Sequence, residues 1–563
     1  MTDGVAHQTP RLLLIGIDGA TWDWLDPLMA DGTMPTCRDL VARGSHAVLR
    51  SVTPPLTPSA WATVLTGKNP GGHGIFDFSR TPSRFAPPDQ QKAEYVSSKL
   101  LPRPYLYDLV GAAGKHVISI NMPMTYPPHQ INGCMITGMF TPRGSSSTFP
   151  ADLQERLADY EVDLKPGEGP QVDAWLLGEE EIVEYEGSPL VSGSRRVLAK
   201  RAQAALTLMA DEPWDLFAIV LTGGDRISHH LWDTMHHPEN PGAAKINKDI
   251  RTFFAELDDA VARLVDAAGP DTTVMFVSDH GFGPGAKRRI HFDLWLEQVG
   301  LARRKTTLMS LIRKVPGNRA ARLAVKALLK RLLPERTSVK LVSKVENRKK
   351  QLDQATDLSR TLVKSRPFCT GVCGFDINPQ LAPPGSDTYE ETRSLLIEKL
   401  SALRDPQTDE PIVEKAMRRE DIYNGPFTDA APNVIAHLNF AYFPFVDPWA
   451  KELVVAVPGR REGDHRFEGV FALTHGPAKP GRIPEQPLDN VAPTALYLLG
   501  LGIPDDMTGQ VIEQAIQPAQ LEAHPPDRKA ADQTDWQTPA EGSGYTEEEE
   551  ADIEQRLKDI GYL

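Results

Sequence analysis

Short runs of consecutive apolar residues recur along the chain, and each is followed within a few residues by an aspartate. The runs and their aspartates are Leu12–Ile17 with Asp18, Leu216–Leu221 with Asp225, and Val274–Val277 with Asp279. Continuous apolar runs of this length are typical of parallel strands that are buried on both faces. Because ligands of open α/β sheets bind beyond the carboxyl ends of the strands, this pattern predicts that the three aspartates share one edge of a sheet.

Amphipathic helical patterns separate these apolar runs. The predicted helices are Pro35–Ala42, Arg195–Met209 and Val491–Leu499, and the later predicted strands are Val434–His437, Leu453–Val457 and Val470–Leu473. Strands that alternate with helices favour an α/β fold with a mostly parallel sheet. We therefore expect one core built from residues 1–300 and 367–516.

The segment 301–366 departs from this alternation and is strongly basic. Between Arg303 and Lys350 it carries 16 Lys or Arg residues against two Glu residues. A predicted helix from Asn318 to Leu333 would place basic residues (Arg319, Arg322, Lys326, Lys330) opposite apolar ones (Ala321, Val325, Leu328, Leu332). Two interpretations stay open: a cap whose apolar stripe packs on the core, or a surface helix that binds anionic lipid.

Composition narrows the class of protein. The chain has 563 residues, 40% of them hydrophobic, and a net charge of −14, which suits a large folded core and argues against a basic protein that coats nucleic acid. No nucleic-acid motif is present. Four cysteines are too few for a disulfide scaffold, and the chain shows no signal peptide or apolar run long enough to span a membrane, so we expect a cytoplasmic protein. Residues 517–563, with 12 acidic and 4 basic side chains, are expected to form a flexible tail with a short last helix near Glu547–Asp559. The sequence leaves the oligomeric state open.

Metal-ligand chemistry is the first functional signal. Carboxylates and imidazoles gather in the predicted strand ends: Asp18, Asp225, His229, Asp279 and His280. This mixture suits Zn²⁺ or Mn²⁺ better than Ca²⁺, which prefers oxygen ligands. Each aspartate taken alone could equally be a helix N-cap, and it is the three similar placements together that favour a metal site.

The second signal is Thr57, which precedes Pro58 in a predicted helix that Gly67 ends. Thr57 is expected to be the N-cap and Pro58 the first helical residue. A capping role would explain this threonine without any chemistry. However, a hydroxyl at a helix N-terminus also lies at a natural anion site, and a neighbouring metal would make it a nucleophile.

Five motifs follow one another in a definite order between Asp18 and Gly469. They are Ile15-Gly-Ile-Asp18-Gly19, Leu56-Thr57-Pro-Ser-Ala-Trp-Ala-Thr-Val-Leu-Thr-Gly67, Gly224-Asp225-Arg-Ile-Ser-His229, Ser278-Asp279-His280-Gly281 and Gly463-Asp-His465-Arg-Phe-Glu-Gly469. This series resembles the alkaline phosphatase superfamily, in particular its type I phosphodiesterases and nucleotide pyrophosphatases. The resemblance implies a three-layer sandwich around a mostly parallel sheet, with the basic helical insertion added to it.

The resemblance also implies a site for two divalent metal ions, most readily Zn²⁺, with Mn²⁺ as the alternative. One ion would be bound by Asp18, Thr57, Asp279 and His280, and the other by Asp225, His229 and His465. Only the resemblance selects His465, since the residues themselves do not favour it over His475. It further implies that Thr57 attacks phosphorus and forms a phosphothreonine intermediate of a phosphodiesterase or pyrophosphatase reaction on an anionic substrate.

Other functions of the superfamily stay open or are disfavoured. Sulfatases need a Cys or Ser where Thr57 stands, so a sulfatase is disfavoured. The asparagine that contacts the phosphoryl group in nucleotide pyrophosphatases is missing from Ser59-Ala-Trp61, which leaves nucleotide specificity open. Phosphoryl transfer to another acceptor, as in mutases, is one alternative, and a membrane-surface protein with weak or lost hydrolase activity is another.

Three residues near Thr57 have a structural and a functional interpretation each. Lys68 is either a surface residue or a phosphate partner, and His73 is either a turn residue or part of the site. Trp61, one helical turn after Thr57, is expected in the core rather than as a stacking platform.

Overall fold

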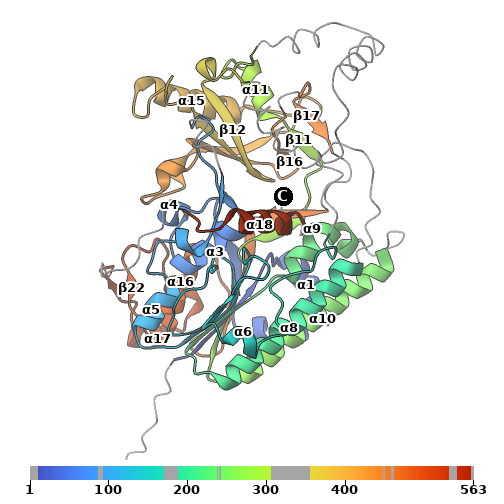
Figure 1. Ribbon diagram of the computed structural model, residues 1–563, viewed down its shortest axis with the longest axis vertical. Helices are drawn as coiled ribbons and strands as arrows, with labels where there is room; N and C mark the ends of the chain where they lie inside the picture. Colours follow the sequence, from blue (N-terminus) through green and yellow to red (C-terminus); the bar gives the residue numbers. More distant parts are fainter. Residues whose placement is uncertain are drawn as a thin grey trace, which may run out of the picture.

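The computed structural model describes residues 10–86, 93–169, 188–237, 239, 243–305, 356–447, 450–457, 462–531 and 542–559. They form a large lobe around a central sheet and a smaller second lobe above it (Figure 1). The predicted basic helix Asn318–Leu333, on which the lipid-surface interpretation depends, lies outside the described residues.

The central sheet has ten strands and a parallel middle. Its order is β20-β2-β19-β9-β1-β8-β5-β6-β7, and β21 pairs with β2. β9, β1, β8, β5 and β6 run parallel, whereas β19 is antiparallel to both β9 and β2, and β7 is antiparallel to β6. The bounds are β1 Leu12–Ile17, β2 Ser45–Arg50, β5 Val117–Met122, β6 Gly133–Thr137, β7 Thr148–Phe149, β8 Leu216–Leu221, β9 Thr273–Val277, β19 Glu468–Thr474, β20 Gly481–Arg482 and β21 Gln486–Pro487.

The three apolar runs of the sequence are the adjacent strands β9, β1 and β8. In register, Gly16 of β1 lies between Val220 of β8 and Val277 of β9, so the three strands end at the same level. All residues of these strands are buried, which explains why their sequences do not alternate between apolar and polar. The prediction that the residues after these strands share one edge is therefore confirmed.

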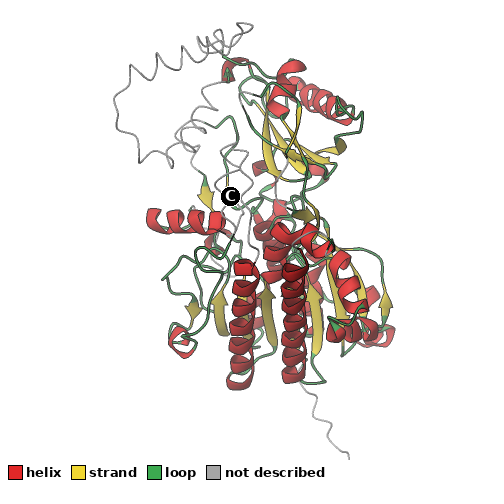
Figure 2. Cartoon of the chain, turned by 90° about the vertical axis from the view of Figure 1, so that its right-hand side faces the viewer, coloured by secondary structure: helices red, strands yellow, loops and turns green. Residues whose placement is uncertain are grey.

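Helices cover both faces of the sheet and complete the sandwich. Figure 1 places α1, α8 and α10 on one side and α3, α5 and α16 on the other, and Figure 2 shows two long helices side by side across the strands. The α/β fold with a mostly parallel sheet is thus confirmed. The helix bounds are α1 Trp22–Ala30, α2 Pro35–Arg43, α3 Thr57–Thr66, α4 Pro70–His73, α5 Leu106–Ala112, α6 Leu153–Arg156, α8 Ser188–Asp211, α9 Gly223–His236, α10 Ala243–Ala268 and α16 Val491–Leu498.

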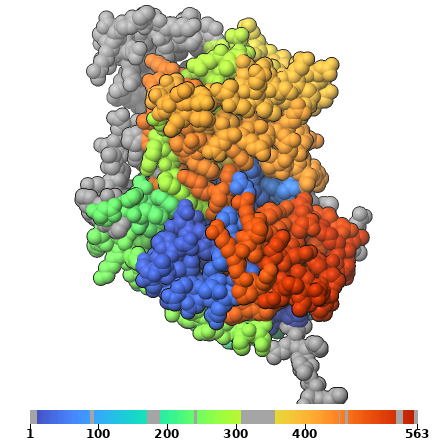
Figure 3. All heavy atoms as spheres, turned by 180° about the vertical axis from the view of Figure 1, so that it is seen from behind, coloured from blue at the N-terminus to red at the C-terminus, as the bar shows by residue number. Residues whose placement is uncertain are grey.

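The second lobe has its own hydrophobic core, formed by buried side chains from Ile290 to Val454. It contains the four-stranded sheet β12-β13-β15-β14 and the three-stranded sheet β16-β11-β17. Seen from behind, its yellow and orange atoms sit on the blue and red atoms of the large lobe (Figure 3). Its bounds are β11 Arg288–Ile290, α11 Phe292–Gln298, β12 Val363–Cys369, β13 Val372–Ile377, α15 Asp387–Ser401, β14 Val413–Arg418, β15 Val434–Leu438, β16 Tyr442–Pro444 and β17 Val454–Ala456.

This lobe corrects the expected assignment of residues 367–516 to the main core. The predicted strands near Val434 and Leu453 exist as β15 and β17, but they pair inside the second lobe rather than in the central sheet. The chain returns to the large lobe with β18 (Gly463–Arg466), which pairs antiparallel with β10 (Gly281–Pro284), and with β19. A strand pattern does not reveal which sheet the strand joins, because the pattern reports burial and not the partner.

The C-terminal part of the chain differs from the expected flexible tail wherever it is described. The predicted last helix is confirmed as α18 (Glu547–Asp559), and its Ile553 and Leu557 are each only 2% exposed. These two apolar side chains anchor an otherwise acidic helix. The overall charge of the segment gave no indication of this contact. The remaining elements are α17 Pro518–Ala523 and the short pairs β22 Ile503–Pro504 with β23 Arg528–Lys529, and β3 Ser79–Arg80 with β4 Glu94–Tyr95.

Among the described residues, the structure contains no helix with the length and apolar character needed to cross a membrane.

Candidate functional site

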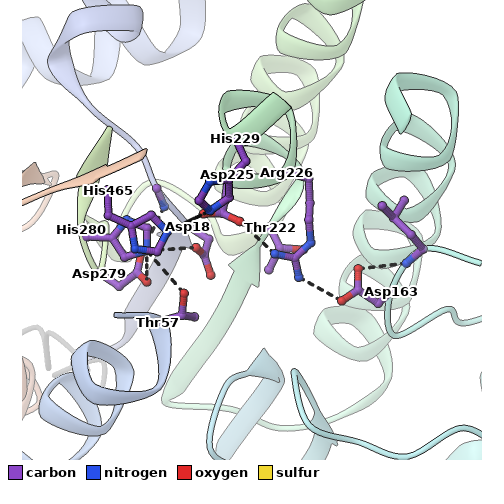
Figure 4. A network of polar contacts seen from close by, with 12 residues as sticks. Asp18, Thr57, Asp163, Thr222, Asp225, Arg226, His229, Asp279, His280 and His465 are labelled. Carbon is purple, nitrogen blue, oxygen red and sulfur yellow. Dashed lines mark hydrogen bonds and ion pairs between the residues drawn. The ribbon is translucent and has the colours of Figure 1, made fainter. Parts of the chain in front are cut away.

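Three carboxylates meet at the carboxyl ends of the adjacent strands β9, β1 and β8. Asp18 follows β1, Asp279 follows β9, and Asp225 lies in the first turn of α9 directly after β8. All three side chains are fully buried. Figure 4 shows them turned toward a common centre. The Gly19 N–H donates to Asp279 Oδ1 at 3.1 Å, and Trp61 Nε1–H donates to Asp18 Oδ2 at 3.3 Å, which fixes two of the carboxylates.

Three imidazoles complete this cluster. His229 follows Asp225 by one turn of α9, and its Nε2 lies 3.6 Å from Asp225 Oδ1. His280 Nε2 lies 3.1 Å from Asp279 Oδ2 and 3.9 Å from Asp18 Oδ1. His465 arrives on β18, with its Nε2 3.0 Å from His229 Nε2 and 3.6 Å from Asp225 Oδ1. The rings of His280 and His465 are stacked, with centroids 3.5 Å apart.

Thr57 lies at the edge of the cluster, at the start of α3. Its Oγ1 is fully buried and 3.4 Å from His280 Nε2. The expected N-cap position is wrong by one residue, because the N-cap residue is Leu56 and Thr57 is the first helical residue. The hydroxyl is therefore not used for capping. It lies at the N-terminus of a ten-residue helix, where unsatisfied N–H groups and the helix dipole favour an anion.

The loop before Thr57 is held from two sides. The Pro55 carbonyl faces His465 Nδ1 at 2.7 Å, which ties the loop to β18. From the second lobe, Tyr423 donates its hydroxyl to the Thr53 carbonyl at 2.7 Å, and His437 Nε2 lies 3.0 Å from Thr53 Oγ1. The position of Thr57 thus depends on residues that the chain supplies far from it in sequence.

The donor atoms fit divalent cations. Asp18 Oδ1 and Asp279 Oδ2 are buried and accept no hydrogen bond from the described residues. The Nδ1 atoms of His229, His280 and His465 face the backbone carbonyls of Gly463, Gly281 and Pro55, which leaves each Nε2 directed into the cluster. A backbone carbonyl on the outer imidazole nitrogen is the arrangement that orients metal-binding histidines. Two overlapping groups of side chains, which share His280, have donor atoms close enough together to hold an ion: Asp225 with His280 and His465, and Asp18 with Asp279 and His280.

The electrostatics also call for a positive charge. Burial, together with the charges of Asp279 and Asp225, raises the pKa of Asp18 well above its ordinary value, and burial likewise raises the pKa of Asp279. Burial lowers the pKa of His280, and His465 lowers it further. The protein itself therefore supplies too little positive charge to stabilise Asp18 and Asp279 in the ionised form. Bound cations would provide it. Asp225 differs, because His229, His465 and Arg226 hold its pKa well below its ordinary value despite burial.

Sequence reasoning missed two residues beside the cluster, Arg226 and Asp163. Arg226 is 2% exposed, and its Nη1 donates to Asp225 Oδ2 at 2.9 Å while its Nη2 donates to Asp163 Oδ2 at 3.0 Å. The position of Arg226 next to Asp225 could have suggested a role. Nothing in the sequence links Asp163 to the site, because it precedes β8 in a loop.

Of the other residues that the sequence singled out, Lys68 and His475 lie outside the cluster, and Trp61 contacts it through its hydrogen bond to Asp18. Lys68 pairs with Asp506 at 2.5 Å, which favours its structural interpretation. Trp61 is buried, as expected of a core residue, and Gly16 lets its ring lie against β1, since a Cβ there would come within 2.4 Å of the ring. His475 follows β19 at the opposite end from β18, in a left-handed turn with φ 62°.

His73 is a structural residue, as its turn interpretation predicted. Its Nε2 lies 2.9 Å from Thr63 Oγ1, and its Nδ1 accepts the Ile75 N–H at 3.1 Å, so it ties α3 to α4 and the following turn. Burial, with a smaller effect of Lys68, lowers its pKa to about 3. The imidazole is therefore neutral in the folded protein at neutral pH.

We expect His73→Gln to lower the free energy of unfolding by about 2–3 kcal/mol at pH 7.5, because it leaves buried polar groups unpaired. Because the pKa of His73 is depressed in the folded state, the unfolded chain binds the proton more readily, and stability falls as the pH drops below about 6.5. The difference between wild type and variant should therefore shrink by up to about 1.4 kcal/mol per pH unit below that point. Chemical denaturation at pH 7.5 and 5.5 measures it. A difference that grows at the lower pH would contradict the assignment.

The chain is similar to one known protein family and to several solved structures. The sequence profile of the family described as type I phosphodiesterase / nucleotide pyrophosphatase matches residues 12–451. Solved structures similar to this chain include human ectonucleotide pyrophosphatase/phosphodiesterase 5, with 14% identity, 90% of this chain and 98% of that chain covered, and a TM-score of 0.48. Phosphonoacetate hydrolase from Sinorhizobium meliloti 1021, in complex with phosphonoformate, has 15% identity, coverages of 87% and 95%, and a TM-score of 0.49. Among curated proteins, none matches the sequence.

The profile covers most of the chain and six of the seven site residues that the sequence predicted; the seventh, His465, lies beyond its end and is brought to the others by the pairing of β18 with β10. The chain belongs to the type I phosphodiesterase/nucleotide pyrophosphatase family and is a phosphoester hydrolase.

Proposed function

We propose that the chain hydrolyses phosphodiesters or pyrophosphates with two divalent metal ions and with Thr57 as its nucleophile. The observation that carries the proposal is the distance of 3.4 Å between Thr57 Oγ1 and His280 Nε2 in a fully buried cluster of carboxylates and imidazoles. Phosphoester substrates are anions, so a nucleophile at a helix N-terminus beside cation ligands suits them.

The proposed ligand sets are those that the family resemblance implies. Asp18, Thr57, Asp279 and His280 would hold one ion, and Asp225, His229 and His465 the other. His280 Nε2 lies near donor atoms of both sets, so this division is part of the proposal. The bound cations, Zn²⁺ or Mn²⁺, would neutralise charge on the phosphoryl oxygens and lower the pKa of the Thr57 hydroxyl.

The chain's own residues supply the rest of the reaction. Thr57 Oγ1 forms a bond to phosphorus, its hydroxyl proton passes to water, and the bond from phosphorus to the leaving oxygen breaks. Water then attacks the phosphothreonine, and Thr57 Oγ1 leaves with its electron pair and regains a proton. Pro58 has no N–H and the Ala60 N–H donates to the Leu56 carbonyl, so the N–H groups of Thr57 and Ser59 are the ones at the start of α3 that would donate to the phosphoryl oxygens in both steps.

A substrate panel with metal analysis on the same sample tests this proposal. Purified protein should contain close to two transition-metal equivalents and should cleave an activated aryl phosphodiester faster than the matching monoester, with the sulfate ester slowest. A metal-loaded protein that is inert on all three esters would overturn the proposal. Faster monoester than diester turnover would keep the chemistry but reverse the substrate class.

Phosphoryl transfer to an acceptor other than water is distinguished by its products. The same diester reaction run with added alcohols should give only hydrolysis products if water is the acceptor. A transferred phosphoryl ester would assign the chain to the transferases of the superfamily instead.

A further inference from the structure

A buried chain of alternating charges leads away from the metal ligand Asp225 (Figure 4). It begins with Arg226, which donates one N–H to Asp225 Oδ2 and another to Asp163 Oδ2. The exposed side-chain fractions of Arg226 and Asp163 are 2% and 8%. At such burial the ion pair is screened little by salt, and a broken partner would leave an uncompensated charge.

Arg226 divides the two oxygens of Asp225 between two tasks. Oδ1 lies 3.6 Å from both His229 Nε2 and His465 Nε2, the side on which a cation would be held. Oδ2 is turned to Arg226 Nη1 at 2.9 Å. A guanidinium on the outer oxygen prevents the carboxylate from rotating, so the inner oxygen keeps its direction.

Asp163 is itself held firmly in place. Its Oδ1 accepts the Leu164 N–H at 2.9 Å, and the preceding Val162 carbonyl accepts an N–H of the buried Arg201 at 2.8 Å. Arg226 and Arg556 keep the pKa of Asp163 below its ordinary value even though burial opposes this, so the residue is a carboxylate at neutral pH. Asp163 thereby balances the charge that Arg226 brings next to the cation site.

The far end of this chain is the C-terminal helix α18. Arg556 of α18 has its Nη2 3.9 Å from Asp163 Oδ2, and its Nη1 donates to the Thr141 carbonyl. The helix is seated by buried Ile553 and Leu557 and by the Arg143 N–H, which donates to Asp552 Oδ2 at 2.7 Å. The last described element of the chain is thus joined, through Asp163 and Arg226, to a ligand of the candidate metal site.

We propose that Arg226 and Asp163 are positioning residues that hold Asp225 for metal binding, and that α18 completes their support through Arg556. This inference rests on the proposed function, since it takes Asp225, His229 and His465 as the ligands of one ion. It predicts that substitutions of Arg226, Asp163 or Arg556, which do not contact the ion at Asp225, lower the affinity of the protein for that ion. The affinity for the ion at Asp18 and Asp279 should not change. A residue needed only for folding would not separate the two ions in this way.

The test is a chelator competition on the metal-loaded protein, with Zn²⁺ as the probe and Co²⁺ for the visible spectrum. Arg226→Lys keeps the charge but cannot reach both carboxylates, and Asp163→Asn removes the balancing charge. Each variant should lower the affinity for the ion at Asp225 by about 10- to 100-fold, which is the range for residues that orient metal ligands from outside the coordination sphere. The affinity for the other ion should stay within about twofold of the wild-type value. Glu161→Gln is the matched control, because Glu161 lies in the same loop but pairs with Arg196 and Lys200.

A third variant examines α18. Arg556→Gln should lower the affinity for the same ion by about threefold to tenfold, because Asp163 keeps its bond to Arg226 but loses the second cation near its Oδ2. Thermal unfolding of every variant is measured alongside, and if Arg226→Lys does not fold, Asp163→Asn and Arg556→Gln decide. Two ions with unchanged affinities in these variants would overturn the inference and leave the proposed function intact. The proposed function itself would be overturned if the wild-type protein bound fewer than two ions. It would also be overturned if the variant Asp225→Asn still bound as many ions as the wild type.

Discussion

Replacing Thr57 by alanine is expected to abolish phosphoester hydrolysis, with a loss of at least about 10³-fold in turnover. The Thr57 hydroxyl oxygen lies 3.4 Å from His280 Nε2, and Thr57 is the first helical residue of α3 rather than its N-cap. Without this oxygen no bond to phosphorus can form on the protein. The remaining ligands of the cluster would still bind cations and substrate, so the loss should lie in kcat rather than in KM.

A matched pair of variants separates chemistry from packing. Thr57→Ser retains the nucleophilic oxygen and should keep measurable turnover. Ser59→Ala removes a fully buried hydroxyl from the same helical turn, where it donates to the Ile75 carbonyl at 2.9 Å, and should leave turnover nearly unchanged. Acid-quenched wild-type protein should carry a phosphothreonine at Thr57 that mass spectrometry detects. Full activity of Thr57→Ala would refute the nucleophile.

The central site could be predicted from sequence because its signals are local. An apolar run followed by Asp18 or Asp279 reports both a buried strand and the residue at its end, and the parallel arrangement of strands then brings those ends together. The four-residue spacing of Asp225 and His229 predicted their proximity for a similar reason, since one helical turn places both side chains on one face. Each of these inferences needs only the geometry of one element and the order of the strands.

What the sequence left undecided depends on contacts between distant segments. Apart from the family resemblance, the residues themselves did not favour His465 over His475, and the pairing of β18 with β10 is what brings His465 to the cluster. The link from Arg226 through Asp163 to Arg556 joins three separate elements, and no local pattern marks it. The second lobe escaped prediction for the same reason, because strand patterns around Val434 are identical whichever sheet they enter.

The tail shows how composition can mislead. Its excess of acidic residues predicted a solvated, flexible segment, yet two apolar residues of α18, Ile553 and Leu557, suffice to seat the helix on the large lobe. Average charge reports the exposed face of a helix, whereas docking depends on the few residues of its buried face. The amphipathic spacing within α18 was the better signal.

Removal of the metal ions is the second change with a large expected effect. Chelator dialysis should abolish hydrolysis and also lower the thermal unfolding midpoint by several degrees, because ligands that bind only the folded state stabilise it. The buried Asp18 and Asp279 oxygens that accept no hydrogen bond would then lack a compensating charge. Re-addition of Zn²⁺ or Mn²⁺ should restore both properties. An unchanged midpoint after verified metal loss would contradict the assignment of these carboxylates.

His465→Ala and His475→Asn give this experiment its sharpest form, since without the family resemblance the residues themselves favour neither histidine. His465 is 4% exposed and its Nε2 lies 3.0 Å from His229 Nε2, whereas His475 occupies a left-handed turn that asparagine tolerates. His465→Ala should lose about one metal equivalent and at least about 10³-fold in turnover, because the loss of a metal ligand removes several kcal/mol of transition-state stabilisation. His475→Asn should retain both ions and its activity. If His475→Asn lost the ion instead, the β18 strand would carry no ligand, and the second half of the site would have to be assigned again.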